Sequence, residues 1–226
     1  KGNINYSGNL KLINIINYKK LKNANENLLL KNKFWLAAST HEGEENFCIE
    51  THIKIKKKYN DIITIIAPRH IHRTEDIKQL CKKANLKCQI LNENDLIQEN
   101  IDIVIINSYG VLNSYFKYCK SVFIGKSLLK NIKYSSGQNP VEAAYLGCKI
   151  YHGPYVYNFE EIYKIFENHK ISQEVLTSEF LAKCILDDLK NPKKIEENYS
   201  NNISNLGQKT FTDTMRIIKN FISNEN

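Results

Sequence analysis

The stretch Ser39–Glu45, which reads STHEGEE, is rich in side chains that bind ligands. It follows directly on the apolar run Phe34–Ala38, which we interpret as a buried strand. Thr40 is a good helix N-cap and the glutamates favour a first helical turn, so capping explains part of the stretch. Capping requires no histidine. We therefore treat Ser39 and His41 as candidate residues for contact with a ligand.

A second candidate stretch, Ala67–Arg73 (APRHIHR), follows another apolar run. We expect Pro68 to end the strand and Arg69 to lie at its carboxyl edge. A guanidinium there suits a phosphate or a carboxylate, because it forms paired charged hydrogen bonds. The alternative interpretation is that Arg69 makes a surface salt bridge.

The third stretch, Ser135–Gly147, reads SSGQNPVEAAYLG and predicts a small-residue loop that leads into a helix near Pro140. Ser136 and Gly137 would let a phosphate approach the backbone closely. The free N–H groups at the helix start would attract an anion. Glu142 could accept hydrogen bonds from ribose hydroxyls, or it could simply complement the helix dipole.

These stretches must be positioned by the alternating elements that the sequence predicts. Apolar runs predict strands at Phe34–Ala38, Asp61–Ala67, Lys87–Leu91, Ile101–Ile106, Ser121–Ile124 and Lys149–His152. Helical spacing predicts helices at Glu44–Tyr59, Thr74–Asn85, Tyr109–Tyr118, Asn139–Leu146, Phe159–Asn168, Ser178–Leu189, near Ile195–Asn205 and at Thr210–Phe221. Strands apolar on both faces that alternate with helices predict a Rossmann-like, doubly wound parallel α/β sheet of about six strands. Ligands of such sheets bind beyond the carboxyl ends of the strands.

The composition limits the classes of partner. The 226 residues carry a net charge of +8, which favours phosphate-bearing partners such as a nucleotide or an anionic membrane surface. We do not expect nucleic-acid binding, because the lysines are spread along the chain without interleaved arginine and aromatic residues. No apolar run is long enough to span a bilayer. We expect the six scattered cysteines to be reduced core thiols. The chain lacks an initiator methionine, and we expect it to be part of a longer protein.

Further motifs complete a family resemblance. Together with SGNLK (Ser7–Lys11), GKSL (Gly125–Leu128) and GPYVYNF (Gly153–Phe159), the candidate stretches resemble, in order, the second half of bacterial 3-deoxy-D-manno-octulosonic acid (Kdo) transferases. STHEGEE and PRH are quite specific to that family, whereas the N-P-x-E pattern is shared more widely among nucleotide-sugar glycosyltransferases. The resemblance covers nearly the whole chain.

The resemblance implies the C-terminal, donor-binding half of a GT-B glycosyltransferase that takes part in lipopolysaccharide synthesis. Its donor would be CMP-Kdo, and transfer would be inverting and would need no metal or other cofactor; the sequence has no D-x-D motif. A missing N-terminal domain would bind the lipid A precursor and carry the general base, so this chain would be inactive alone. The whole protein would lie in the cytoplasm, peripheral to or anchored at the inner membrane.

The resemblance also implies roles for single residues. Lys11 would approach the leaving phosphate, and His41 would contact the sugar or shape the cleft. The residues that would hold or line CMP are Pro68, Arg69, Tyr109, Gly110, Val111, Ser136, Gly137, Asn139, Pro140, Val141 and Glu142.

The resemblance further divides the chain into a connector and domain start (1–33), a nucleotide-sugar-binding domain (34–207) and a helix that crosses back to the missing domain (208–226). The chain departs from the family pattern at Asn107, Val111, Lys126 and Gln138. Two alternatives therefore remain open. One is a degenerate nucleotide-binding module without transferase activity, and the other is a basic adaptor that docks on a membrane surface.

Overall fold

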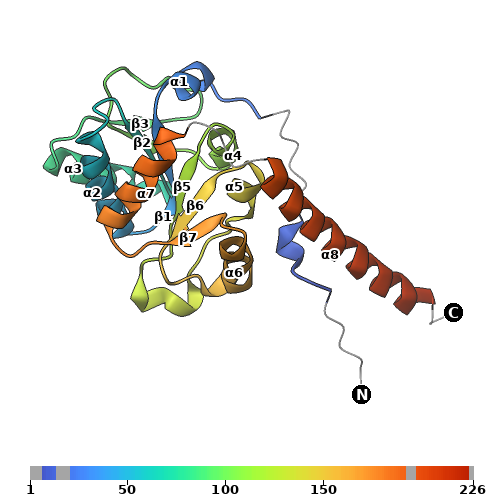
Figure 1. Cartoon of the computed structure of the whole chain (residues 1–226). Helices are drawn as coiled ribbons and strands as arrows, with labels where there is room; N and C mark the ends of the chain where they lie inside the picture. Colours follow the sequence, from blue (N-terminus) through green and yellow to red (C-terminus); the bar gives the residue numbers. More distant parts are fainter. Residues whose placement is uncertain (1–6, 14–20, 192–196, 224–226) are drawn as a thin grey trace.

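A seven-stranded sheet forms the centre of the computed structural model, which describes residues 7–13, 21–191 and 197–223 (Figure 1). Its order is β3-β4-β2-β1-β5-β6-β7, and every neighbouring pair is parallel. The strands are β1 Phe34–Thr40, β2 Ile63–Pro68, β3 Cys88–Leu91, β4 Ile103–Ile106, β5 Ser121–Ile124, β6 Lys149–His152 and β7 Ser172–Glu174. The predicted doubly wound parallel sheet is confirmed.

The central strands are the long apolar runs of the sequence. In β1, Leu36 and Ala38 face one hydrophobic core, whereas Trp35 and Ala37 face the other. A strand with two buried faces needs apolar side chains at every position, which is why the run is continuous. The sequence did not predict β7, because this short edge strand reads Ser-Gln-Glu and only its first residue is buried.

Helices cover both faces of the sheet, as expected for this fold. One core joins the sheet to α2 Glu44–Lys56, α3 Thr74–Lys83 and α7 Ser178–Lys190. The other joins it to α1 Glu26–Lys31, α4 Leu112–Phe116, α5 Val141–Tyr145 and α6 Glu160–Asn168. Short 3-10 turns are η1 Leu10–Leu12, η3 Ile71–Arg73, η4 Lys130–Ser135 and η5 Tyr157–Phe159.

The strand order reverses between β1 and β5. From β1 the chain passes to β2, then to the edge strand β3 and back to β4 between them, and it then crosses to place β5 on the other side of β1. The chain after β1 and the chain after β5 therefore lead to helices on opposite faces of the sheet. This reversal is the switch point at which parallel α/β sheets form a crevice for ligands.

The C-terminal helix α8, Glu197–Ser223, is one continuous helix, whereas the sequence predicted two pieces. The helix runs through Gly207 without a break. A side chain at Gly207 would lie 2.5 Å from the carbonyl oxygen of Leu12, so glycine allows α8 to pack closely on η1. Tyr145 donates to the same oxygen at 3.0 Å.

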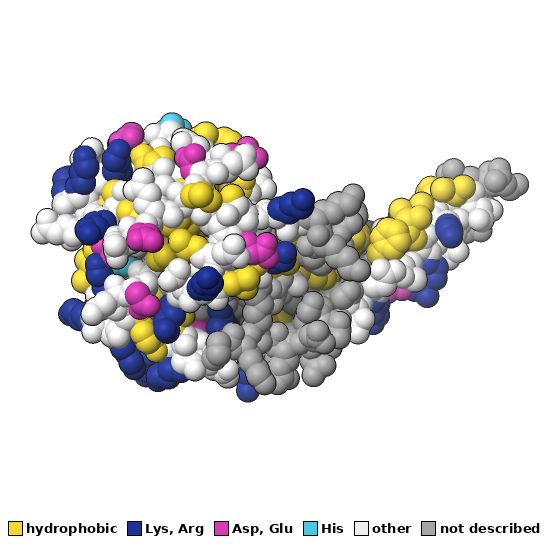
Figure 2. All heavy atoms as spheres, turned by 90° about the horizontal axis from the view of Figure 1, so that it is seen from above, with side chains coloured by type: hydrophobic (Ala, Val, Ile, Leu, Met, Phe, Trp, Pro, Cys, Tyr) yellow, Lys and Arg dark blue, Asp and Glu magenta, His cyan; other side chains and the backbone are white. Residues whose placement is uncertain are grey.

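Beyond this contact, α8 projects away from the sheet (Figure 1). Hydrophobic side chains follow its projecting part in the space-filling view (Figure 2). The exposed members are Phe211, Met215, Ile218, Phe221 and Ile222. The division of the chain at residues 33 and 207 stays a prediction. In the structure, α8 runs through the second of these boundaries without a break.

Two further expectations concern thiols and membrane spans. All six cysteines are free, and Cys48, Cys81, Cys119 and Cys148 are buried, as expected for core thiols. Among the described residues, no helix combines the length and the apolar character needed to cross a bilayer.

We expect the stability of the chain to fall in mild acid because of His52. This side chain is fully buried, with Nδ1 2.8 Å from Oγ1 of Thr64. Burial lowers the pKa of His52 from 6.5 to about 4, although Asp102 opposes the shift. Since unfolding frees the imidazole to take up a proton, stability falls as the pH drops below about 6.5 and the loss levels off near pH 4. The loss amounts to about 3 kcal/mol.

Urea unfolding at pH 7.5 and pH 4.5 tests this expectation. His52→Gln should lose about 2–3 kcal/mol less than the wild-type chain between the two pH values. His169→Gln, which changes a histidine outside the core, is the control. Equal losses in the wild-type chain and in His52→Gln would contradict the assignment.

Candidate functional site

The predicted motifs meet at the carboxyl edge of the sheet. STHEGEE begins with the last two residues of β1 and runs into α2, PRH begins with the last residue of β2 and GKSL follows β5, while the loop SGQNP leads into α5. Because all strands are parallel, these loops leave the sheet at the same edge. The motifs after β1 and β5 flank the switch point itself.

The carboxylate of Glu44 joins the two loops at the switch point. Its Oε2 atom accepts the backbone N–H groups of His41 and Lys126, at 2.9 and 2.7 Å. Its Oε1 atom accepts those of Ser127 and Leu128, at 2.8 and 3.0 Å. The side chain is only 1% exposed. Four N–H donors therefore satisfy one buried negative charge and bind the loop after β5 to the loop after β1.

The two loops approach each other very closely. A Cβ atom on Gly125 would lie 2.6 Å from the carbonyl oxygen of Ser39 and 2.7 Å from Oε2 of Glu44. Ser39 and Lys126 both have left-handed backbones, with φ angles of 55° and 58°. Such angles cost a non-glycine residue about 1 kcal/mol or more. The contacts of Glu44 oppose this strain.

The network continues into the loop that precedes α5. Gly137 donates its N–H to the carbonyl of Lys126 at 2.7 Å. The buried Ser136 accepts two backbone N–H groups. Its Oγ accepts that of Tyr157 at 3.3 Å, and its carbonyl accepts that of Asn158 at 3.0 Å. Ser136 therefore helps to hold the GPYVYNF segment, and its predicted phosphate contact stays a prediction.

Ser127 connects the same segment to β5. Its Oγ accepts the N–H of Gly153 at 2.9 Å, and its carbonyl accepts that of Tyr155 at 2.9 Å. A Cβ atom on Gly153 would lie 2.3 Å from this carbonyl, so only glycine fits there. The motif loops after β1, β5 and β6 and before α5 thus form one hydrogen-bonded framework.

Thr40 does not cap α2, contrary to the sequence expectation. It ends β1 as a fully buried residue, and the N-cap position belongs to Gly43 with a φ of 96°. The helix starts too far along the chain for Thr40 to reach its free N–H groups. Instead, Glu44 turns back to the N–H of His41.

Arg69 is exposed at the end of β2, as predicted. Its backbone N–H donates to the carbonyl of Thr40 at 2.9 Å, which holds the PRH segment beside the loop after β1. The next basic residue behaves differently. Arg73 is paired with the buried Glu45, with Nη1 2.6 Å from Oε1. Arg73 therefore belongs to the framework, whereas Arg69 faces solvent.

Three imidazole rings lie beside Arg69. The ring centroids of His41 and His70 are 5.6 Å apart, as are those of His70 and His72. Burial lowers the pKa of His41, and the positive charges of Lys126 and His70 lower it further, against the Ser39 carbonyl and the charge of Glu45. Among the described residues, no group of three or more His, Cys, Asp or Glu is arranged to hold a metal ion.

The start of α5 differs from the predicted helix. The helix has five residues, Val141–Tyr145, and its first N–H donates to Oδ1 of Asn139 at 3.0 Å. Pro140 has no N–H to offer. So short a helix has a small dipole, and anion binding here would rest on the backbone of the preceding loop. Glu142 is half-buried in the first turn, at the predicted place.

Lys11 lies beside the GPYVYNF segment. Its Nζ atom donates to the carbonyl of Asn158 at 3.0 Å and lies 4.3 Å from the centre of the Phe159 ring. The ammonium is thus held by the loop after β6. Its predicted approach to a leaving phosphate would require it to leave these contacts, and stays a prediction.

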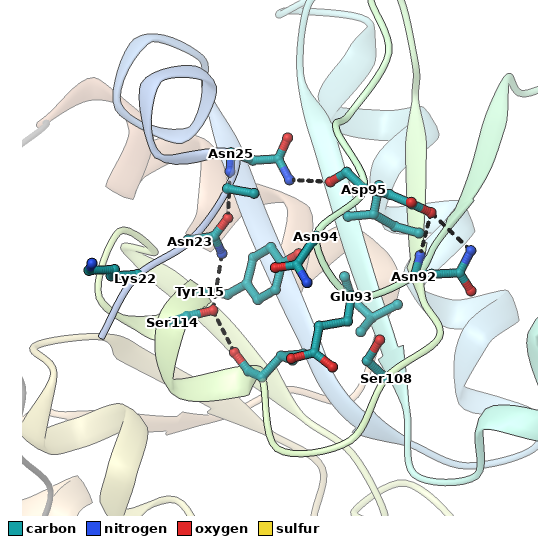
Figure 3. Close-up of a pocket in the computed structure, with 14 residues that line it drawn as sticks. Lys22, Asn23, Asn25, Asn92, Glu93, Asn94, Asp95, Ser108, Ser114 and Tyr115 are labelled. Carbon is teal, nitrogen blue, oxygen red and sulfur yellow. Dashed lines mark hydrogen bonds between the residues drawn. The ribbon is translucent and has the colours of Figure 1, made fainter. Parts of the chain in front are cut away.

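Tyr109, Gly110 and Val111 lie in the loop after β4, where Tyr109 is 62% exposed. A small polar cavity of about 90 Å³ lies behind this loop (Figure 3). Its volume holds a few water molecules and is too small for a nucleotide. Hydrogen bonds join the segment before α1 to the start of α4 at this cavity: Asn23 donates to Ser114 at 3.1 Å, and Ser114 donates to the carbonyl of Val111 at 2.7 Å.

Sequence reasoning missed the framework roles of Glu44 and Ser127, and it missed Asn25, which joins the segment before α1 to the loop after β3. Asn25 is 5% exposed, accepts the N–H of Ile97 at 2.8 Å and donates to the carbonyl of Asp95 at 2.9 Å. No local pattern marks Asn25, since its partners lie about 70 residues away. For Glu44, a glycine followed by two carboxylates after a strand was a usable signal.

Comparison with known proteins gives sequence relatives of one kind. No protein-family model matches the chain. The chain is 28% identical over 167 residues to the 3-deoxy-D-manno-octulosonic acid transferase of Haemophilus influenzae, which covers 74% of this chain and 38% of that protein. It is 28% identical over 224 residues to that of Rickettsia prowazekii, covering 95% and 47%. A probable mitochondrial transferase of Arabidopsis thaliana is 27% identical over 202 residues, covering 85% and 44%. The chain spans less than half the length of these relatives.

In fold, the chain is similar to the crystal structure of the C-terminal CMP-Kdo binding domain of WaaA from Acinetobacter baumannii. The TM-score is 0.66 at 20% identity, over 81% of this chain and 91% of that domain. The predicted resemblance to Kdo transferases is confirmed, and the chain shares the fold of that C-terminal domain.

We expect Glu44→Gln to destabilise the chain by about 3 kcal/mol. The amide keeps one acceptor oxygen, but its NH₂ group would face N–H donors in a buried site. Glu42→Gln is the matched control: this neighbouring carboxylate is exposed, and its loss should change stability by about 0.5 kcal/mol or less. Denaturant unfolding at neutral pH measures both. A cost for Glu44→Gln no larger than that for Glu42→Gln would contradict the framework role.

Proposed function

Since the chain is similar to Kdo transferases in sequence and to the CMP-Kdo binding domain of one of them in fold, we propose that it is the donor-binding domain of such an enzyme. The observation that carries the proposal is the framework at the switch point. Glu44 binds the loop after β1 to the loop after β5, and Lys126 binds the latter to the loop before α5. In parallel α/β sheets of other proteins, ligands bind at such a point.

CMP would lie across this edge with its phosphate near Arg69. The turn Asn139–Glu142 would hold the ribose, and Tyr109–Val111 would line the base. Arg69 and the loop N–H groups favour the leaving group because they stabilise phosphate charge as it develops. His41 would contact the sugar or shape the cleft.

The reaction would be an inverting transfer without a metal. An acceptor hydroxyl oxygen forms a bond to the anomeric carbon of Kdo while the bond from that carbon to the phosphate oxygen breaks. CMP leaves with the bonding electron pair, and the hydroxyl proton passes to a general base. We propose that this base and the lipid A precursor acceptor belong to a separate N-terminal domain, so that the present chain binds donor but does not transfer it.

The exposed apolar stripe on α8 would contact that domain. Phe211, Met215, Ile218, Phe221 and Ile222 are too hydrophobic a set to remain in water without a partner. The net charge of +8 would favour an anionic surface, which suits a peripheral position at the cytoplasmic face of the inner membrane.

A second candidate is a degenerate module that binds nucleotide without supporting transfer. The side chain of Asn107 donates to Asn92 at 2.9 Å, and Val111 offers no carboxylate to a ligand. CMP binding by this chain combined with an inactive whole protein would favour this candidate.

Arg69→Ala should weaken CMP binding about ten- to a hundredfold. One charged phosphate contact contributes about 1.5–3 kcal/mol, and 1.4 kcal/mol corresponds to a factor of ten. Glu142→Gln should also weaken CMP binding, because its proposed partner is the ribose. Isothermal titration of the 226-residue chain with CMP measures both effects. Arg216→Ala, which removes an exposed arginine from α8, should bind CMP like the wild type. Unchanged affinity in both site variants, with the fold intact, would place the nucleotide elsewhere.

Ile218→Glu should leave the stability of this chain within about 0.5 kcal/mol of the wild type, since Ile218 is 44% exposed on the projecting helix. In the whole protein the same change should lower the thermal midpoint, because it would put a charge into the interdomain contact. Asn220→Glu makes the same charge change at an exposed polar residue of α8 and is the control. If both substitutions have equal effects in the whole protein, the stripe does not contact another domain.

A further inference from the structure

Lys126 is a lysine with a fixed backbone and an unengaged side chain. Its N–H donates to Glu44 at 2.7 Å, and its carbonyl accepts the N–H of Gly137 at 2.7 Å. The residue is half-buried in the loop after β5. Among the residues that the structure describes, no hydrogen bond or ion pair is made by its ammonium group.

The backbone conformation of Lys126 is strained. Its φ of 58° lies in the left-handed region, where glycine is the residue without cost and lysine loses about 1 kcal/mol or more. Strain of this kind persists where surrounding contacts fix it, and it concentrates at functional sites. The hydrogen bonds to Glu44 and Gly137 hold this conformation. Compared with glycine, lysine contributes only its charged side chain at this position.

The nearby carboxylates do not engage the ammonium group of Lys126. His41 lies close enough to both Lys126 and His70 for their positive charges to lower its pKa. The two nearby buried carboxylates are already satisfied: Glu44 accepts four backbone N–H groups, and Glu45 is paired with Arg73. The ammonium of Lys126 and the guanidinium of Arg69 therefore have no ion-pair partner among the described residues and remain available to an anion from solution.

We propose that Lys126 binds the phosphate of the donor nucleotide, opposite Arg69 across the switch point. Lys126 follows β5 and Arg69 follows β2, and β1 lies between these two strands. The carbonyl of Lys126 is bound to Gly137, whose loop borders the same phosphate position. This inference rests on the proposed function, and it assigns a phosphate contact to a residue outside the motif roles given above.

The substitution Lys126→Gly tests the side-chain charge without disturbing the left-handed backbone at this position. It removes the ammonium and relieves the left-handed strain, so the fold should be at least as stable as the wild type. CMP affinity should fall about tenfold or more, and the affinity should depend less on salt concentration. Lys126→Arg keeps the positive charge and should restore most of the binding.

Lys170→Gly is the matched control. Lys170 has the same φ of 58° and lies between α6 and β7, at the opposite edge of the sheet. Its substitution removes the same charge and the same strain, and it should leave CMP affinity unchanged. Isothermal titration with CMP, with cytidine as the ligand that lacks a phosphate, compares all four proteins.

The outcomes distinguish the inference from the proposed function. Wild-type binding of CMP that weakens in Lys126→Gly but not in Lys170→Gly, with cytidine binding unchanged, supports the inference. Equal CMP affinity in wild type and Lys126→Gly overturns the inference and leaves the proposed function standing, as does an equal loss of CMP and cytidine binding. If the wild-type chain does not bind CMP, both fail.

Discussion

The buried carboxylate of Glu44 holds together the edge of the sheet on which the candidate site lies. Parallel strands bring loops to one edge, but their hydrogen bonds end where the strands end. Beyond β1 and β5 the backbone N–H groups need other acceptors, and Glu44 satisfies four of them from two loops. Beyond the ends of β1 and β5, a single negative charge thus takes the place of strand pairing.

The close approach of these loops explains several residue choices at once. Gly125 and Gly153 leave no room for a Cβ atom, and Ser39 and Lys126 have strained backbones. Gly125, Ser39 and Lys126 lie where the loops after β1 and β5 meet around Glu44, and Gly153 lies against Ser127. Two nearby arginines differ in their surroundings: Arg69 is exposed, whereas Arg73, four residues later, is paired with Glu45. The edge therefore consists of a rigid interior and a basic surface.

The C-terminal helix illustrates a different constraint. Close packing of Gly207 on Leu12 fixes the base of α8 against η1, while the rest of the helix projects with an apolar stripe. A helix with one apolar face normally buries it. The body of the domain offers no surface along that part of α8, which is why we assign the stripe to a partner domain.

The amino-acid sequence by itself determined the sheet and the edge of the sheet at which the candidate residues lie. The runs at Phe34–Ala38 and Ile103–Ile106 are apolar at every residue, and only a strand buried on both faces requires that. The family motifs also located Arg69 and Glu142 at the carboxyl edge. These are local signals, because burial and turn chemistry are written in neighbouring residues.

Only the tertiary structure decided which polar residues hold the framework and which remain free for a ligand. Glu44 meets Lys126 from 82 positions away, and Asn25 meets Ile97 from 72. The sequence assigned helix capping to Thr40, but the structure buries it and gives the turn to Glu44. It also joined two predicted tail helices into α8, because Gly207 serves a packing contact that no local pattern reveals. Hydrogen bonds between distant loops depend on where the fold places their ends, and local sequence does not contain that information.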